Sequence, residues 1–184
     1  MDEKLFVMLG RLEMEAANIQ ALDPDSAKFV SMLAISKKVK TIVEVGAGHG
    51  YSTLWLAYAA SLTGGKVITC ENNETKAAEA QANVDKAGLS SYVEIITGDA
   101  REELRHRDEA IDFVFLDGEA GQYETYFDVV YKRLGLGAMI VADDVVESEN
   151  DLSDYVTYVQ NHPNLESVTV PLGDGLEITV KTGE

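Results

Sequence analysis

Apolar and polar positions along the chain follow a helical period first and then an alternation of strands with helices. In the first forty residues, apolar side chains recur at intervals of three and four, which is typical of amphipathic helices. Asp23 followed by Pro24 marks the start of a helix, because aspartate caps a first turn and proline suits its first position. From Thr41 onward, short β-branched or apolar runs are followed by helical segments.

This order predicts an α/β fold in which a mostly parallel, seven-stranded sheet carries helices on both faces. Two late strands, Ser167–Val170 and Leu176–Val180, are joined by a Gly-Asp-Gly turn, so the sheet should end in an antiparallel edge strand. Ligands bind such sheets beyond the carboxyl ends of the strands, near the point where the strand order reverses. The expected parallel strands are Thr41–Val45, Lys66–Cys70, Tyr92–Ile96, Ile111–Leu116 and Ala138–Ala142, and the expected helices among them are Tyr51–Ser61, Thr75–Lys86, Gln122–Leu134 and Leu152–Asn161.

The chain contains no internal repeat, low-complexity tract or linker, so residues 1–184 are expected to form one domain. An apolar content of 46% is enough for a sizeable core, and Cys70 has no cysteine partner for a disulfide bond. The 32 acidic and 15 basic residues give a formal net charge of −17, which argues against nucleic-acid and anionic-membrane partners. Because no long uncharged apolar run and no signal-peptide core occur, we expect a cytoplasmic protein.

A glycine-rich turn follows the first strand and reads EVGAGHGYS over residues 44–52. Glycines at alternate positions let the backbone turn tightly and approach a ligand, and the helix that follows directs free N–H groups to the same place. The spacing G-x-G-x-G differs from the dinucleotide pattern G-x-G-x-x-G, so it fits a nucleoside without a pyrophosphate better than NAD. The alternatives are a tight turn with no ligand and, more remotely, an NAD-dependent oxidoreductase.

Acidic residues also follow the second and third strands. Glu71 stands at the end of the second strand, where a carboxylate accepts two hydrogen bonds from a ribose diol or is simply solvated. Asp99 lies in the sequence Gly98-Asp99-Ala100, where it suits either an adenine amino group or the cap of a helix starting at Ala100. With the glycine turn ahead of them, the two acids favour a nucleoside site.

Three further carboxylates, those of Asp117, Asp143 and Asp144, follow the fourth and fifth strands and are expected to share one rim of the sheet. Unpaired, they repel one another and raise their own pKa values. A hard divalent cation resolves this repulsion, and ligation by oxygen alone favours Mg²⁺ or Ca²⁺ over zinc. Alternatively, Asp117 holds a substrate or an amino group while Asp143 and Asp144 stabilise turns.

Together these stretches resemble class I S-adenosylmethionine-dependent methyltransferases, and more narrowly the metal-dependent O-methyltransferases of the catechol and caffeoyl-CoA type. The resemblance implies a Rossmann-like methyltransferase fold and methyl transfer to a hydroxyl group of a small, metal-chelating, catechol-like acceptor. It also implies a homodimer, with the helices of residues 1–40 forming part of the dimer surface or covering the acceptor. The matching stretches are residues 43–53, 98–100, 113–118, 137–144 and 171–176.

The resemblance further implies a role for each motif. The glycine turn would hold the methionine half of the cofactor, the acid after the second strand the ribose, and the segment around Asp99 the adenine. Asp117 and Asp143 are the expected catalytic residues. The expected cofactor-binding residues are Glu44, Gly46, Gly48, Gly50, Ser52, Glu71, Asn72, Asp99, Ala100 and Asp117, and the expected ligands of Mg²⁺ or Ca²⁺ are Asp117, Asp143 and Asp144.

The chain departs from the family pattern at three places. Asp143-Asp144 stands where Asp-Asn is usual, which changes the charge of the site. Ala120 occupies the place of a lysine general base, although Tyr123 and Tyr126 follow as in the family, and the segment after Asp144 is short. Two alternatives therefore stay open, a metal-independent methyltransferase and an S-adenosylmethionine-binding protein with weak or no catalysis.

Overall fold

One seven-stranded sheet forms the centre of the computed structural model, which describes residues 2–19, 21–146 and 148–184. The strand order is β3-β2-β1-β4-β5-β7-β6, and every pairing is parallel except those made by β7. The chain therefore builds outward from β1 to β3 and then returns to place β4 on the other side of β1, which opens a crevice at the carboxyl ends of β1 and β4. The strands are β1 (Thr41–Val45), β2 (Lys66–Glu71), β3 (Val93–Thr97), β4 (Ile111–Leu116), β5 (Leu134–Ala142), β6 (Leu165–Val170) and β7 (Leu176–Lys181).

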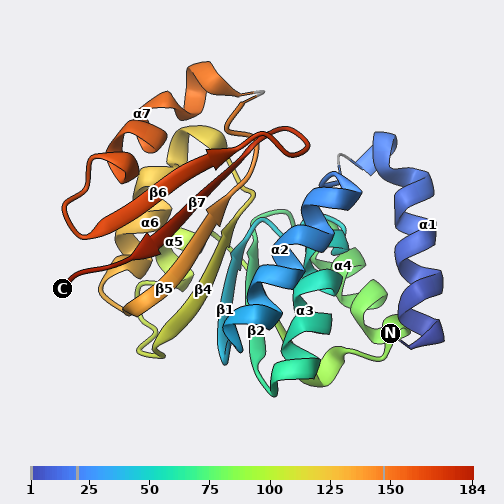
Figure 1. Ribbon diagram of the computed structural model, residues 1–184. Helices are drawn as coiled ribbons and strands as arrows, with labels where there is room; N and C mark the ends of the chain where they lie inside the picture. The colour runs from blue at the N-terminus through green and yellow to red at the C-terminus, as the bar shows by residue number, and fades with distance from the viewer. Residues whose placement is uncertain (1, 20, 147) are drawn as a thin grey trace.

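Helices cover both faces of the sheet, as the sequence predicts, and α1 to α4 lie on one side while α5 to α7 lie on the other (Figure 1). Each side has its own apolar core, built around Phe113 and Phe115 on the first side and Phe127 and Val114 on the second. The helices are α1 (Glu3–Ile19), α2 (Pro24–Lys37), α3 (Tyr51–Thr63), α4 (Glu74–Ala87), α5 (Ala100–Glu103), α6 (Tyr123–Tyr131) and α7 (Glu149–Gln160), with short 3₁₀ turns η1 (Ser90–Tyr92) and η2 (Ala120–Gln122).

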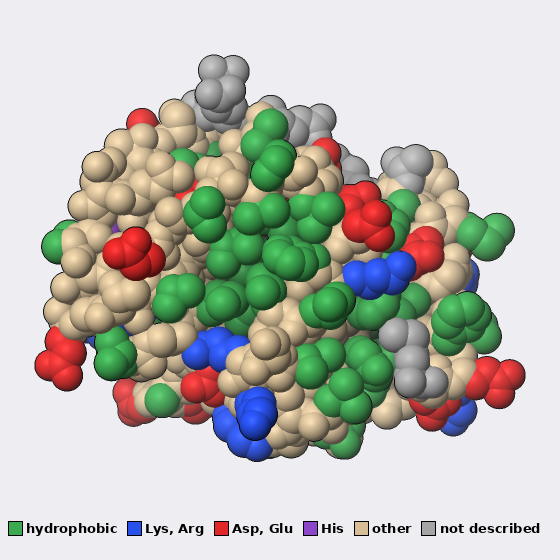
Figure 2. Space-filling view, viewed as in Figure 1, with side chains coloured by type: hydrophobic (Ala, Val, Ile, Leu, Met, Phe, Trp, Pro, Cys, Tyr) green, Lys and Arg blue, Asp and Glu red, His purple; other side chains and the backbone are tan. Residues whose placement is uncertain are grey.

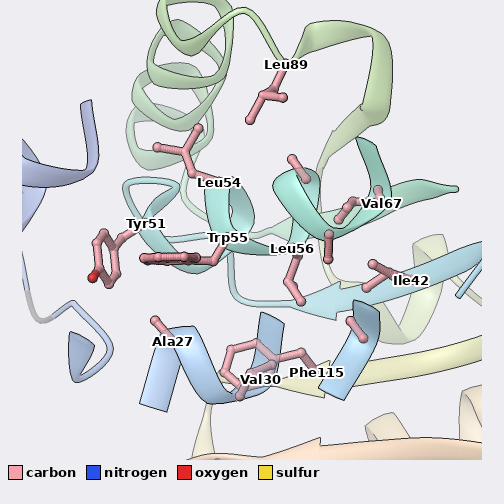
Figure 3. Packing of buried hydrophobic residues seen from close by; sticks show 14 of the residues in the cluster. Ala27, Val30, Ile42, Tyr51, Leu54, Trp55, Leu56, Val67, Leu89 and Phe115 are labelled. Atoms are coloured by element: carbon pink, nitrogen blue, oxygen red, sulfur yellow. The ribbon is translucent and has the colours of Figure 1, made fainter. Parts of the chain in front are cut away.

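Helix α3 is apolar on all sides because it lies between other helices and the sheet. Figure 3 shows Leu54 on the side of Leu89, whereas Trp55 lies on the side of Ala27 and Val30 in α2. Leu54 is fully buried, and Trp55 is 8% exposed. This packing holds the first turn of α3, which follows the glycine-rich turn, in a fixed position against the sheet.

The apolar stripe of α1 packs against other helices of the same chain. Leu5, Leu9 and Leu12 are buried, and α1 packs against α4 and α3. Polar contacts add to this packing, since the Arg11 guanidinium donates to Asn83 Oδ1 at 2.9 Å. The segment after α1 thereby reaches the crevice above β1.

The hairpin at the end of the chain differs from the sequence prediction. The antiparallel strand β7 lies between β5 and β6, so the edge strand β6 runs parallel to β1 through β5. On the α7 side of β7, the buried Glu177 carboxylate accepts hydrogen bonds from Gln160 Nε2 at 2.9 Å and Ser167 Oγ at 2.6 Å. These partners hold the Glu177 carboxylate inside the protein, which places β7 in the interior of the sheet. Strand β6 instead exposes the side chains of Glu166 and Val168, and an edge strand tolerates such exposure.

Two element boundaries also differ. Strand β5 begins at Leu134 rather than Ala138, because it continues through Gly135 and Gly137 with a register irregularity against β4. Helix α6 ends at Tyr131, three residues before the expected end. Across the described residues, no helix combines the length and the apolarity needed to cross a membrane.

On the α2 side of β5, β7 and β6, no helix within the described residues covers the sheet, and apolar side chains gather there (Figures 1 and 2). We call this surface the open sheet face and define it by Met139, Val168, Val170, Ile178 and Val180, which strand pairing places on one side. Val168 is 58% exposed, and the other four are half-buried.

Candidate active site

A pocket of about 330 Å³ opens at the carboxyl ends of β1 to β4, where the fold predicts a ligand. It receives residues from the turns after all four strands, from the segment between α1 and α2, and from Asp144 after β5. The expected site residues that line it are Gly46, Gly48, Ser52, Glu71, Asn72, Asp99, Ala100, Asp117 and Asp144.

The glycine-rich turn lies close to the end of β4. Gly46 has φ +92°, and a Cβ atom added there would lie 1.9 Å from the carbonyl oxygen of Asp117. Only glycine permits both this backbone conformation and this approach. Helix α3 then starts after Gly50 with no side-chain cap, so N–H groups of its first turn are available at the pocket.

Glu71 connects the turns that follow β1 and β2. Its Oε2 accepts a hydrogen bond from the Gly48 N–H at 2.9 Å, and its Oε1 accepts one from the Asn73 N–H at 2.8 Å. The side chain is only 7% exposed and still lines the pocket. Each carboxylate oxygen keeps a second acceptor direction, which suits the two hydroxyl groups of a ribose.

Asp99 performs the capping role that the sequence left open. Its Oδ1 accepts from the Arg101 N–H at 2.9 Å at the start of α5. The Arg101 side chain also pairs with Asp99, which lowers the pKa of Asp99, and donates to Gln122 Oε1 at 2.8 Å. Asp99 nevertheless lines the pocket, so an adenine contact remains a prediction.

The three acids after β4 and β5 meet at one end of the pocket. One carboxylate oxygen from each of Asp117, Asp143 and Asp144 lies within 4.8 Å of the others. Burial, followed by the charges of Asp143 and Asp144, raises the pKa of Asp117 well above its ordinary value. Burial, followed by the charge of Asp144, raises the pKa of Asp143 to about 7.

This cluster has the properties of a site for a hard cation. Asp143 is 4% exposed, and its Oδ1 has no hydrogen-bond partner among the described residues. Asp144 adopts φ +64°, a left-handed conformation that costs a non-glycine residue about 1 kcal/mol and often occurs at functional sites. A divalent cation would satisfy the unpartnered oxygen and offset the repulsion, so the donor set fits Mg²⁺ or Ca²⁺.

Three expected residues lie outside the pocket lining, namely Glu44, Gly50 and Asp143. Glu44 is completely buried behind the glycine turn, where its Oε2 accepts from Thr53 Oγ1 at 2.6 Å. Ala120 does not line the pocket, although its neighbour Glu119 does.

Leu22 and Arg101 also line the pocket, although their sequence motifs did not predict it. Leu22 belongs to the segment between the first two helices, whose position depends on tertiary packing. Arg101 comes two residues after Asp99 in the sequence, so its nearness to an expected site residue could have suggested that it lines the pocket.

Comparison with known proteins identifies the fold and the chemistry of its relatives. A family model described as "Methyltransferase domain" matches residues 43–145. A catechol O-methyltransferase from Niastella koreensis is 34% identical over 160 residues, which cover 85% of this chain and 72% of that protein. Caffeoyl-CoA O-methyltransferase 2 from Petunia hybrida is 26% identical and covers 88% of this chain and 76% of its own length. The crystal structure of an O-methyltransferase from Bacillus cereus in complex with SAH aligns with a TM-score of 0.84 and 26% identity, covering 99% and 92% of the two chains.

The approach of Gly46 to β4 generates a prediction about stability. We expect Gly46→Ala to destabilise the protein by about 2–4 kcal/mol, because the added methyl group meets backbone atoms of Asp117. Gly48→Ala is the matched control, since its Cβ would meet no atom within 4 Å and only its positive φ is unfavourable. Urea unfolding measures both, and equal losses would contradict the clash.

The burial of Glu44 generates a prediction about pH. Burial raises the folded-state pKa of Glu44, so its contribution to stability is fully present below the unfolded-state pKa and is lost as pH rises through the folded-state value. We expect the melting temperature of Glu44→Gln, relative to wild type, to increase from pH 5 to pH 8. Circular dichroism melts measure this difference, and a pH-independent difference would contradict the assignment.

Proposed function

This chain belongs to the methyltransferase domain family as a class I S-adenosylmethionine-dependent O-methyltransferase, and from that premise we propose that it methylates a hydroxyl group of a catechol-like acceptor with the help of a divalent cation. The observation that carries the proposal is the cluster of Asp117, Asp143 and Asp144 at the end of a glycine-lined pocket. Two adjacent hydroxyl groups chelate a cation, so a catechol fits a pocket that joins a nucleoside site to an acidic cluster.

The pocket residues are proposed to bind the cofactor in extended form. Glu71 would accept from the ribose hydroxyls, Asp99 and Ala100 would border the adenine, and Ser52 with the first turn of α3 would hold the methionine end. Methyl transfer requires the acceptor oxygen to lie in line with the methyl carbon and water to be excluded. The rigid contact between the glycine turn and β4 supports this alignment, because it sets the cofactor loop against Asp117.

The cation, Mg²⁺ or Ca²⁺, would be held by Asp117, Asp143 and Asp144. When bound, it would supply a Lewis acid that lowers the pKa of the acceptor hydroxyl and orients it. The three carboxylates would keep the cation beside the pocket, and the buried position of Asp143 would exclude water from its far side.

We also propose that two copies associate through the open sheet face. A molecule with a formal net charge of −17 repels a second copy over most of its surface, so association favours a face with few carboxylates. Within the described parts of β5, β7 and β6, Glu166 is the one acid on this side, and Val180 is its cross-strand neighbour. A two-fold axis would bring each apolar face against its equal.

The acidic surface supports a small-molecule acceptor over nucleic-acid or membrane partners, and the sequence is consistent with a cytoplasmic location. Residues 1–184 are proposed to act as one domain in which residues 1–40 cover the pocket, because Ile19 and Leu22 line it.

The central test is calorimetric titration with S-adenosylmethionine, with and without Mg²⁺, followed by a screen of catechols. We expect Glu71→Gln to weaken cofactor binding at least about tenfold, because it replaces a charged acceptor of two hydrogen bonds. Glu74→Gln, which removes an exposed charge nearby in α4, is the control. Unchanged affinity of Glu71→Gln would contradict the cofactor site.

The titrations together with activity assays in the catechol screen distinguish the alternatives. Activity that persists in a strong chelator would indicate a metal-independent methyltransferase. Cofactor binding without turnover on any catechol would indicate a binding protein.

Ala120 generates a prediction about the missing lysine. We expect Ala120→Lys to increase kcat on catechols at least about tenfold, because a general base contributes about 10²–10⁴-fold. Ala120→Met adds similar length without the amine and should leave kcat near wild type. Steady-state kinetics measure both variants, and equal rates would show that the cation or another group already replaces the base.

The open sheet face generates a prediction about assembly. We expect Val168→Asp to convert the dimer to a monomer at about 10 μM, because it places a charge in the apolar contact. Val7→Asp, which changes an equally exposed position on α1, should leave the dimer intact. Sedimentation velocity measures both, and dissociation by Val7→Asp alone would assign the interface to α1.

A further inference from the structure

The two halves of the glycine turn are held by different elements. The sheet holds the first half, because Gly46 lies against the carbonyl group of Asp117 and the Gly48 N–H donates to Glu71. The second half, residues 49 and 50, leads directly into α3, whose first turn is proposed to hold the methionine end of the cofactor. The contacts of this second half therefore set where the free N–H groups of α3 stand.

Helix α4 holds the second half of the turn. A Cβ atom on Gly50 would lie 3.1 Å from Cα of Ala80, so the two backbones are in close contact. One helical turn later, Asn83 Nδ2 donates to the carbonyl oxygen of His49 at 2.8 Å. Among the described residues, this is the one side-chain hydrogen bond to backbone atoms of residues 49 and 50. The Asn83 amide therefore fixes the peptide unit from which α3 starts.

The side chain of His49 makes a weaker contact with α4. Its Nε2 lies 3.3 Å from Glu79 Oε2, but the Glu79 side chain is exposed, and an ion pair would need a protonated ring. Asn83, in contrast, is buried, so water does not compete for its hydrogen bond.

Arg11 of α1 fixes the orientation of the Asn83 amide. Its guanidinium donates to Asn83 Oδ1 at 2.9 Å, whereas the other polar atom of the amide donates to His49. Arginine has only donors and a carbonyl group only accepts, so a rotated amide would set donors against donors at one contact and acceptors against acceptors at the other. One arrangement therefore satisfies both contacts, and it joins α1 to the glycine turn through a single side chain.

Tyr51 provides a second link between α1 and this region. Its hydroxyl donates to Glu13 Oε1 at 2.8 Å. The Tyr51 side chain is buried, belongs to the first turn of α3 and lines the pocket. Helix α1 thus reaches both sides of the junction between the glycine turn and α3.

We propose that Asn83 is a positioning residue for S-adenosylmethionine, and that Arg11, by orienting its amide, couples the packing of α1 to cofactor affinity. The inference rests on the proposed cofactor site and adds to it two residues that lie outside the pocket lining. Asn83 acts through the carbonyl group of His49 rather than by contact with the cofactor. Loss of its hydrogen bond therefore weakens cofactor binding, whereas a cofactor that is already bound stays aligned with the acceptor.

The first test is Asn83→Asp, which keeps the acceptor for Arg11 and removes the donor to His49. We expect the calorimetric affinity for S-adenosylhomocysteine to fall about fivefold, because a carboxylate then faces the carbonyl oxygen. KM for S-adenosylmethionine should rise by the same factor, and kcat at saturating cofactor should change by less than about twofold. Gln81→Glu is the matched control, since it adds the same charge to α4 at an exposed contact with Asp85.

The second test is Arg11→Met, which changes an exposed position and so does not depend on the folding of a buried variant. We expect about a threefold loss of affinity for S-adenosylhomocysteine, because the released amide can rotate away from His49. Lys4→Met, which removes another exposed cation from α1, should leave the affinity unchanged. Unchanged affinity of Arg11→Met would overturn the coupling to α1.

Melting temperatures of all variants separate positioning from stability. A lower melting temperature of Asn83→Asp with unchanged affinity would mean a purely structural contact and would overturn the inference, as would an equal loss of affinity in Gln81→Glu. Failure of the wild type to methylate any catechol would overturn the proposed acceptor class alone, because the calorimetric comparison needs no acceptor. Failure of the wild type to bind S-adenosylhomocysteine would overturn the proposed cofactor site and this inference together.

Discussion

The contact between the glycine turn and the end of β4 is the constraint on which the site depends. Gly46 lies so close to the carbonyl group of Asp117 that no side chain fits between them. Because β1 and β4 are neighbours in the sheet, this contact fixes the distance between the glycine turn and Asp117, the first acid of the cluster. Glu71 extends the same rigid unit to β2 through the Gly48 amide. Pocket-lining groups that follow three strands are thus joined by direct contacts.

The acidic end of the pocket, in contrast, lowers the free energy of unfolding. Asp143 is buried and Asp117 beside it is half-buried, and their raised pKa values reflect unfavourable desolvation and repulsion. The left-handed backbone at Asp144 adds to this cost. Structures keep such unfavourable arrangements mainly where function requires them. The cores around Phe113 and Phe127 on the two faces of the sheet supply the compensating burial.

Most of the fold could be predicted from the sequence, because strand and helix signals alternate and short connections permit few topologies. The glycine turn, Glu71 and the three aspartates could also be predicted to lie near one another, because residues that follow parallel strands gather at one edge of the sheet. Strand β5 was expected too short because Gly135 and Gly137 are typical of loops, yet the strand continues through them as an irregularity between the paired residues Leu134 and Met139. The contribution of Leu22 to the pocket could not be predicted, because tertiary packing of α1 on α4 brings it there.

The buried carboxylate of Glu177 has a consequence far from its own position. Its hydrogen bonds to Gln160 and Ser167 match one alignment of β7 against β6, and a slip by one residue would turn that charge toward the apolar side. The turn between these strands carries Asp174 and is hydrogen-bonded to Val146, so the alignment set on one face of the sheet also determines how this turn meets the segment after β5. An insertion or deletion within β7 would therefore shift the segment that follows Asp144 even if every pocket residue were retained.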